Sequence, residues 1–263
     1  MTKVALLLTT YNWPEALSLV LDSVSRQSRL PDEVVIADDG SLPDTMSIIK
    51  KFEVVFPNKV SHVWQEDLGF RKTIILNKAL LTINSDYIVQ IDGDCILHKH
   101  FIKDHLRFSE KNTYLFGSRV NLNEHRTEDV IQQQKFKSVT AFSRGINRRT
   151  RAIHLPLLSG LYKSKNKLSS KVRGCNFSYW RSDVLKINGY DESYIGWGRS
   201  DSDFAVRLLH SGVLAKRIRY AGIVYHLWHK VNSKAGLKSN SDIFEKVMRE
   251  KIVVASKGLK QRL

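Results

Sequence analysis

Short apolar runs alternate with amphipathic stretches through the first 100 residues. The apolar runs are KVALLLTTYN, DEVVIADDGS, KVSHVWQE and DYIVQIDGDCIL. Between them lie WPEALSLVLDSVSRQ, LPDTMSIIKKFEVVF and GFRKTIILNKALLTI, which are typical of helices. Strands that are nearly all apolar and separated by helices form a parallel sheet that is covered on both faces. The sequence therefore predicts an α/β fold.

Polar residues follow each apolar run at the point where the predicted strand ends. The clusters are TTYN, ADDGS, QEDLGF and DGDC. Ligands of parallel sheets bind beyond the carboxyl ends of the strands. We therefore expect these four clusters to face one crevice.

The second half of the chain is less regular. From Arg119 to Arg173 it is polar and strongly basic, with no strand rhythm, which is typical of a lid or binding loop. Dense structure then returns: DSDFAVRLLHSG predicts a helix closed by Gly212, and AGIVYHLWHK predicts a strand. The segment SDIFEKVMREKIVVASKG predicts an amphipathic tail helix.

The bulk composition is that of a globular protein, since 42% of the 263 residues are hydrophobic. The formal charge of +16 favours a polyanionic partner, such as nucleic acid, anionic lipid or a phosphorylated substrate. No apolar run reaches the roughly 18 residues of a membrane span, and the start MTKVALLLTTYN is too short for a signal peptide. We therefore expect a cytoplasmic chain. Cys95 and Cys175 are too few and too isolated for a disulfide framework and are predicted to be reduced and structural.

Asp92 and Asp94 flank Gly93 at the end of the fourth predicted strand. On an extended strand, this spacing points both carboxylates to the same side. Such hard oxygen ligands suit Mg²⁺ or Mn²⁺, which commonly bridge carboxylates to substrate phosphates. Taken alone, the tripeptide fits an ordinary hairpin turn better, so the metal site depends on its context.

Two other strand ends supply that context. Asp38 and Asp39 offer acceptors for a base or a ribose, and the alternative is a helix N-cap around Ser41 or Asp44. Arg71 and Lys72 begin a predicted helix and would neutralise a diphosphate, unless they are solvated surface cations.

His226 and His229 are candidate nitrogen ligands that would complete a metal site begun by Asp94. The alternative is that they are packed structural histidines. Two histidines in an H-x-x-H pair on one strand point in different directions, so we expect His226 to contact the metal more directly.

Together these residues resemble a known family. TTYN, ADDGS, GFRKTIILNKAL and DGDC, in that order, are similar to the amino-terminal half of inverting family 2 glycosyltransferases of the GT-A fold. The block GCNFSYWRSDVLKINGYDESYIGWGRSDSDFAVRLLHSG resembles the galactosyltransferase-type segment of β-1,4-galactosyltransferases, polypeptide GalNAc-transferases and bacterial chondroitin-type polymerases. The resemblance covers residues 3–118 and 173–230.

The resemblance implies a GT-A fold, with a mostly parallel Rossmann-like sheet, helices on both faces and a smaller acceptor-side elaboration. Residues 1–118 would bind the nucleotide sugar, and residues 119–172 would form a basic loop near the acceptor or the membrane. Residues 173–230 would carry the acceptor site and the catalytic base. Residues 231–263 would form a basic amphipathic helix.

The resemblance also assigns roles to single residues. The uracil pocket would be lined by Thr9, Tyr11 and Asp38, with Arg71 near the phosphates. Asp92 and Asp94 would form the D-x-D metal and ribose site, and His226 and His229 would be the late metal-binding histidines. The predicted sugar contacts are Gly174, Trp197, Gly198 and Asp203.

The catalytic base implied by the resemblance is Asp201, in GWGRSDSD. The family usually reads W-G-x-E-D here, and Ser200 replaces the glutamate that helps to hold the acceptor sugar. The identity of the acceptor therefore does not carry over. Asp203 is the nearby second carboxylate and the weaker candidate for the base.

The implied function is Mn²⁺- or Mg²⁺-dependent, inverting transfer of a hexose or N-acetylhexosamine, with galactose or N-acetylgalactosamine favoured. The donor would be a UDP-sugar and the acceptor a saccharide, lipid-linked and held at an anionic membrane, as in the synthesis of bacterial lipopolysaccharide or capsule. The location would be cytoplasmic and peripheral on the inner face of the membrane.

Three alternative functions would each explain some of these observations. A nucleic-acid-binding protein would explain the charge, but the acidic strand ends argue against it, so we expect no nucleic-acid partner. A metal-dependent phosphoryl-transfer enzyme would use the same carboxylates without needing GWGRSDSD. A catalytically weak binding subunit would keep the fold alone.

Overall fold

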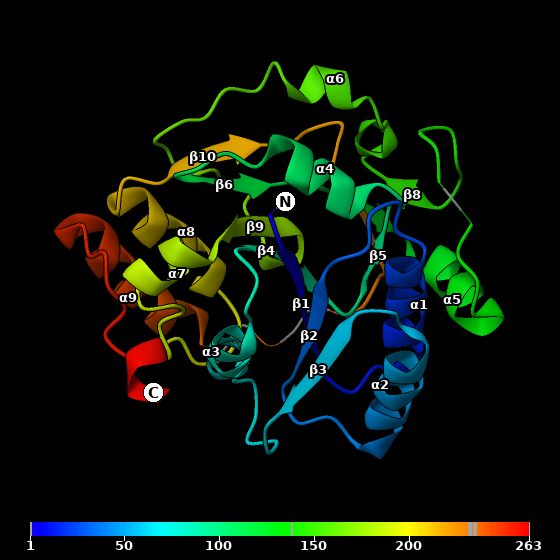
Figure 1. Cartoon of the computed structure of the whole chain (residues 1–263), viewed down its shortest axis with the longest axis horizontal. Helices are drawn as coiled ribbons and strands as arrows, with labels where there is room; N and C mark the ends of the chain where they lie inside the picture. The colour runs from blue at the N-terminus through cyan, green and yellow to red at the C-terminus, as the bar shows by residue number, and fades with distance from the viewer. Residues whose placement is uncertain (1, 138, 231–232, 234–235, 263) are drawn as a thin grey trace.

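A seven-stranded sheet forms the centre of the computed structural model, which describes residues 2–137, 139–230, 233 and 236–262 (Figure 1). In spatial order its strands are β10 (Leu214–Arg217), β6 (Thr113–Phe116), β9 (Phe177–Trp180), β4 (Tyr87–Asp92), β1 (Val4–Thr10), β2 (Glu33–Asp38) and β3 (Lys59–Trp64). Neighbouring strands run parallel except at β9, which lies antiparallel between β6 and β4. The predicted parallel α/β sheet is confirmed.

Helices cover both faces of this sheet, as predicted. They are α1 (Pro14–Ser25), α2 (Pro43–Val55), α3 (Lys72–Thr82), α4 (Phe101–Phe108), α5 (Glu124–Gln133), α6 (Pro156–Ser159), α7 (Arg181–Lys186), α8 (Ser200–His210) and α9 (Leu237–Glu250). Short 3₁₀ turns are η1 (Arg149–Ala152), η2 (Gly174–Asn176) and η3 (Leu259–Arg262). None of the helices in the described ranges is long and apolar enough to cross a membrane.

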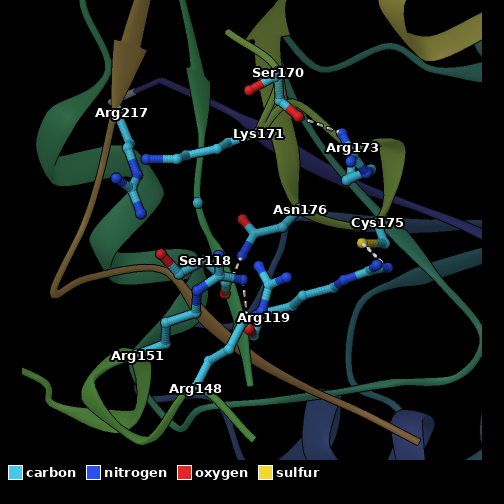
Figure 2. Close-up of a pocket in the computed structure, with 11 residues that line it drawn as sticks. Ser118, Arg119, Arg148, Arg151, Ser170, Lys171, Arg173, Cys175, Asn176 and Arg217 are labelled. Atoms are coloured by element: carbon cyan, nitrogen blue, oxygen red, sulfur yellow. Dashed lines mark hydrogen bonds between the residues drawn. The ribbon is translucent and has the colours of Figure 1, made fainter. Parts of the chain in front are cut away.

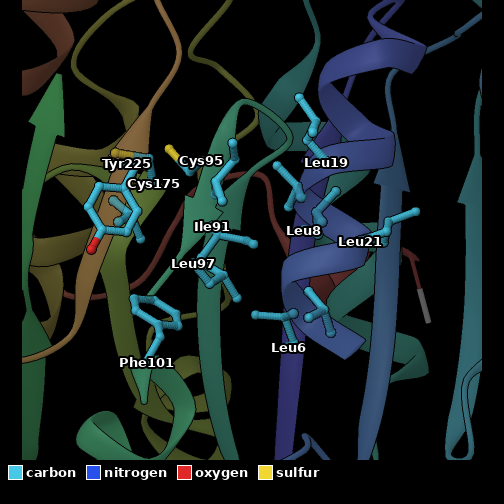
Figure 3. Packing of buried hydrophobic residues seen from close by; sticks show 14 of the residues in the cluster. Leu6, Leu8, Leu19, Leu21, Ile91, Cys95, Leu97, Phe101, Cys175 and Tyr225 are labelled. Carbon is cyan, nitrogen blue, oxygen red and sulfur yellow. The ribbon is translucent and has the colours of Figure 1, made fainter. Parts of the chain in front are cut away.

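Strand β1 divides its side chains between two hydrophobic cores, because alternate residues of a strand face opposite sides. Leu6 and Leu8 pack in the core beneath α1 and α2, together with Ile91 of β4 (Figure 3). Ala5 and Leu7 pack in the second core, against residues of α3, α7 and α8. Both faces of the strand are therefore buried, which explains its unbroken apolar sequence.

A second sheet of four strands packs beside the first. It consists of β5 (Cys95–Leu97), β11 (Ile223–His226), β7 (Ser118–Leu122) and β8 (Ile146–Asn147). Strands β7 and β8 and helix α5 fall in the segment that the sequence predicted to be without strands, so that prediction was wrong. The alternation of apolar and polar residues that marks β7 is only five residues long. Buried Val120 and Leu122 alternate there with partly exposed Arg119 and Asn121.

The stretch DYIVQIDGDCIL is not one strand, contrary to the prediction. β4 ends at Asp92, Gly93 and Asp94 form a turn, and β5 starts at Cys95 in the other sheet. Gly93 makes the turn possible: its N–H donates to the Thr9 carbonyl at 2.7 Å, and a Cβ would lie 2.9 Å from that oxygen. The two carboxylates therefore stand at the crossing between two sheets rather than on one strand.

The predicted tail helix is displaced towards the amino terminus. The helix expected over 241–258 is α9, which ends at Glu250, followed by Lys251 in the left-handed conformation. The next residues, Ile252, Val253 and Val254, are β-branched and resist continuing a helix. The helix predicted to close at Gly212 is confirmed as α8.

Candidate active site

Hydrogen bonds join the carboxyl ends of four neighbouring strands, as the polar clusters predicted. Thr9 at the end of β1 donates its hydroxyl to Asp92 Oδ1 of β4 at 2.8 Å. Asp39, directly after β2, accepts from Gln65 Nε2 at 2.5 Å and from the Arg71 N–H at 2.8 Å. Gln65 directly follows β3, so the strand ends form one continuous polar edge.

Two of the residues predicted to line the uracil pocket differ in their exposure. The Tyr11 side chain is 52% exposed, and its hydroxyl donates to Asp67 Oδ2 at 2.8 Å. Asp38 is 1% exposed: Oδ1 accepts the Ser41 N–H at 2.8 Å, and Oδ2 lies 3.0 Å from His62 Nε2. The buried Asp38 carboxylate thus holds the loop after β2 through a hydrogen bond, whereas the Tyr11 side chain is exposed to solvent. No pattern in the sequence singles out Asp67 or His62.

Lys72 forms an ion pair with one of the strand-end carboxylates. It is the first residue of α3, and its Nζ lies 2.6 Å from Asp92 Oδ1. Burial alone would lower the pKa of Lys72, but the charges of Asp92 and Asp201 outweigh it and raise that pKa, so the ammonium stays charged. The Arg71 guanidinium instead donates to the carbonyl of Glu66.

Asp94 faces both candidate histidines. Its Oδ2 lies 3.4 Å from His226 Nε2 and 3.2 Å from His229 Nε2. The two rings converge, contrary to the expectation for an H-x-x-H pair on a strand, because β11 ends at His226. His229 lies beyond the strand, where the alternation of side chains no longer applies. Asp92, with Thr9 and Lys72 as partners, faces a different set of groups.

The protonation of this cluster suits a divalent cation. Burial raises the pKa of Asp94, but the hydrogen bond from His229 and the nearness of both imidazoles outweigh it and hold that pKa well below its usual range, so the carboxylate is charged. Burial lowers the pKa of His226, which favours the neutral imidazole that binds metals, whereas the hydrogen bond to Asp94 raises the pKa of His229. The ligand atoms of Asp94, Cys95 and His226 lie within 4.8 Å of one another. Burial raises the pKa of the Cys95 thiol well above its usual value, so oxygen and nitrogen are the main donors.

Asp201 lies in the first turn of α8, and its carboxylate is held by the backbone of η2. Its Oδ2 accepts the Gly174 N–H at 2.8 Å. A Cβ on Gly174 would lie only 2.6 Å from Asp201 Oδ1, so glycine allows the close approach. Because the Asp201 charge acts on Lys72, the structure brings this carboxylate to the same region as the Lys72–Asp92 pair.

Asp203 does not join this region. It is 1% exposed and lies 2.7 Å from the buried guanidinium of Arg207, one helical turn along α8. The Tyr194 hydroxyl also donates to it, at 3.2 Å. The sequence predicted a sugar contact for Asp203, but its carboxylate is enclosed in the packing of α8.

The loop that carries Trp197 is fixed from two sides. The Gly196 N–H donates to the Phe70 carbonyl at 3.3 Å, which joins this loop to the segment before α3. Asn240 of α9 donates its side-chain amide to the carbonyls of Ile195 (3.0 Å) and Gly198 (3.1 Å). The Trp197 side chain is 39% exposed at the end of the loop. Sequence reasoning missed Asn240, which is one polar residue in an amphipathic helix.

Two family models match the chain in sequence. The model described as glycosyl transferase family 2 matches residues 6–168, which is more than half of the chain. The chain belongs to glycosyl transferase family 2. The model described as N-terminal domain of galactosyltransferase matches residues 156–230, which include Gly174, Asp201 and His226.

Individual relatives agree with this family. The chain is 21% identical over 246 residues to a chondroitin synthase of Escherichia coli, covering 84% of this chain and 34% of that protein. It is 25% identical over 272 residues to a hyaluronan synthase of Pasteurella multocida, covering 94% of this chain and 27% of that protein. The chain thus spans about a third or less of the length of these family relatives.

The fold also matches solved glycosyltransferase structures. The mannosyltransferase PcManGT of Pyrobaculum calidifontis, in complex with GDP-Man and Mn²⁺, gives a TM-score of 0.64 at 17% identity, covering 94% of this chain and 64% of that one. This likeness confirms the predicted GT-A fold of the family.

Proposed function

We propose that this chain transfers a hexose or N-acetylhexosamine from a UDP-sugar to a saccharide acceptor, with inversion at the anomeric carbon. The observation that carries the proposal is the convergence of three groups beyond the strand ends: Asp94 with its two histidines, the Lys72–Asp92 pair, and Asp201 held by Gly174. Family membership supports it, and so do the polysaccharide synthases among the relatives.

The match to the galactosyltransferase domain supports galactose or N-acetylgalactosamine as the sugar. The choice of a UDP-sugar rests on the resemblance of TTYN and ADDGS to the uracil pocket of the family. The Tyr11 side chain is exposed just beyond the end of β1, where a base would stack against its ring. Residues 1–118 would bind the donor, and residues 173–230 would position the acceptor.

Asp94, His226 and His229 would hold Mn²⁺ or Mg²⁺, with Asp92 shared between the metal and the ribose. The Asp94 carboxylate and the Nε2 atoms of His226 and His229 already converge and thus fit such an ion. When bound, a divalent cation there supplies positive charge that stabilises the leaving diphosphate.

The chain's own residues supply the rest of the chemistry. Lys72, kept protonated by Asp92 and Asp201, offers a second positive charge to the leaving diphosphate. Asp201 accepts the proton of the attacking acceptor hydroxyl, while Gly174 holds one of its oxygens and so fixes the direction of the other. A single displacement with the base and the leaving group on opposite faces of the sugar inverts the anomeric centre.

The acceptor would be a lipid-linked saccharide of a bacterial surface glycan. The charge of +16 supports binding at an anionic membrane surface, where each basic residue close to the lipid contributes about 1 kcal/mol. The enzyme would then act as a peripheral protein on the cytoplasmic face.

Protection against thermal unfolding tests the donor and the metal together. We would compare UDP-galactose, UDP-N-acetylgalactosamine, UDP-glucose, UDP-N-acetylglucosamine and GDP-mannose, each with Mn²⁺ and with EDTA. A bound donor at about 100 times its Kd should stabilise the fold by about 3 kcal/mol, or roughly 5–10 °C, and only with Mn²⁺.

Two carboxylate variants sharpen this test. Asp94→Asn should abolish the Mn²⁺-dependent protection, whereas Asp22→Asn, at an exposed ion pair on α1, should leave it unchanged. Protection by no nucleotide sugar, or equal protection in EDTA, would refute the proposal.

A further inference from the structure

A pocket rich in cationic side chains opens beside Gly174 (Figure 2). Its lining residues are Gly117, Ser118, Arg119, Arg148, Arg151, Ser170, Lys171, Arg173, Cys175, Asn176 and Arg217. We call it the basic pocket. Resting on the proposed function, we propose that the basic pocket binds a phosphoryl or pyrophosphoryl group of the acceptor, close to the hydroxyl that attacks the donor sugar.

The positive charge of the basic pocket is not balanced by the residues that line it. Six of its lining residues are Arg or Lys, and none of those that the structure describes is acidic. Burial lowers the pKa of Arg151, and the charges of Arg148 and Arg217 lower it further. The charge of Arg217 is also the main cause that lowers the pKa of Lys171. Such mutual repulsion is relieved when a multiply charged anion binds between the cations.

The basic pocket has a built floor, unlike a solvated basic surface. Asn176 is buried, and its Nδ2 donates to the carbonyls of Ser118 (3.0 Å) and Gly222 (2.7 Å). Ser118 is 3% exposed, and its Oγ has no hydrogen-bond partner in the described part of the chain. Nε of Arg217 likewise has no hydrogen-bond partner in the described part of the chain. A buried donor without a partner is unfavourable, and an anion in the basic pocket would satisfy it.

The floor lies next to the proposed catalytic base. Arg173 and Cys175 line the basic pocket, and Gly174 between them donates its N–H to Asp201. Figure 2 shows Arg119 reaching along the floor to Cys175, where its Nη1 lies 3.9 Å from Sγ. Part of the lining of the basic pocket and the backbone group that holds Asp201 therefore belong to one three-residue segment, which favours a site for the part of the acceptor next to the attacking hydroxyl.

The chemistry of the cations favours phosphate. Arginine presents a planar fork that pairs with phosphate oxygens, and Figure 2 shows Arg148, Arg151 and Arg217 gathered around one space with Lys171. The donor diphosphate already has Lys72 and the Asp94 cluster, so the basic pocket is left for the acceptor. A single carboxylate, such as that of a uronic acid, would balance only one of the six charges.

Binding of inorganic pyrophosphate, measured by calorimetry in EDTA, tests the proposal. Arg148→Gln with Lys171→Gln removes two charges from exposed side chains, which spares the fold. We expect this pocket variant to bind pyrophosphate roughly 10- to 100-fold more weakly than the wild type. The matched control, Lys50→Gln with Lys51→Gln on exposed positions of α2, should bind like the wild type.

Further measurements distinguish which kind of anion the basic pocket binds. Equal pyrophosphate affinity in the pocket variant and the wild type would overturn the proposal, and so would glucuronate binding as tightly as pyrophosphate. If the pocket variant no longer bound vesicles of phosphatidylglycerol and phosphatidylcholine but kept its pyrophosphate affinity, these cations would be assigned to the membrane. That result would overturn the proposal as well. Tighter binding of a single-stranded oligonucleotide than of pyrophosphate would do the same.

The two proposals fail separately. UDP-sugar protection in the presence of Mn²⁺ should be equal in the wild type, the pocket variant and the control. If that protection is present but pyrophosphate binding does not depend on the basic pocket, the acceptor proposal alone is refuted. If pyrophosphate binding depends on the pocket and no nucleotide sugar protects, the anion site stands and the donor proposal is refuted.

Discussion

The amide of Gly174 lies 2.8 Å from Asp201 Oδ2, and a methyl group at Gly174 would lie 2.6 Å from the other carboxylate oxygen. Gly174→Ala should therefore push the Asp201 side chain out of position. We expect transfer to fall at least tenfold with nucleotide binding unchanged, because the proposed nucleotide contacts Thr9, Asp38 and Asp92 lie on β1, β2 and β4. Initial rates and UDP-sugar affinity measure the two effects.

A matched glycine provides the control for that variant. The nearest atom to a Cβ on Gly160 is a backbone oxygen at 3.3 Å, and the residue follows a surface helix. Gly160→Ala should leave both transfer and donor affinity within about twofold. A Gly174→Ala enzyme of normal rate would show that the position of Asp201 does not matter.

Asp201→Asn keeps the size of the side chain and removes the base. Loss of a general base lowers rates by about 100- to 10,000-fold. We expect that loss in transfer, with Mn²⁺-dependent UDP-sugar protection retained, since neither the Asp94 cluster nor Tyr11 is touched. Unchanged transfer would refute the assignment of the base.

Asp203→Asn should give the opposite result. Removing one partner of a buried ion pair destabilises a fold by about 3–5 kcal/mol, because the remaining Arg207 charge is left uncompensated. Urea unfolding should show this loss, while the folded fraction keeps its affinity for the donor. A variant of normal stability with weakened acceptor binding would restore the sugar contact that the sequence predicted.

His105 predicts how stability depends on pH. The ring is fully buried between Ser178 Oγ (2.7 Å) and Asn176 Oδ1 (3.1 Å), and burial lowers the pKa of His105 to about 4. Its pKa in the unfolded chain is about 6.5, so the unfolded state binds the extra proton between these values. The contribution of His105 to the free energy of unfolding is therefore complete above about pH 6.5. It should fall by about 3 kcal/mol as the pH drops through 4.

Urea unfolding across this pH range checks the sign and the size of that effect. His105→Gln cannot take up the proton, so its free energy of unfolding should fall less steeply between about pH 6.5 and pH 4. An identical slope in the variant and the wild type would mean that other groups cause the acid sensitivity.

The sequence predicted the sheet better than it predicted the partners of single residues. Apolar strands and helical spacing are local signals, so β1 to β4 and α8 could be found from them. The break at Gly93 could not, because it depends on contact with the Thr9 carbonyl, which lies more than 80 residues earlier in the chain. Asp92 and Asp94 consequently have separate partners, although their spacing suggested one shared direction.

Other misses have the same physical origin. The convergence of His226 and His229 depends on where β11 ends, and the burial of Asp203 depends on Arg207 packing inward. The basic pocket draws cations from β7, η1, the segment before η2 and β10, which only the tertiary fold brings together. In the sequence, all of these cations except Arg217 belong to the segment that was predicted to be a basic loop.

Strand β9 joins the two halves of the chain within one sheet. It fills the space between β4 and β6, pairing Gln90 with Phe177 and Leu115 with Ser178. A fragment that stopped before residue 177 would leave both neighbouring strands with open edges, which invite pairing with other chains. The two matched family segments are therefore not interchangeable modules, and a swap between relatives would have to carry β9 together with the strands on either side of it.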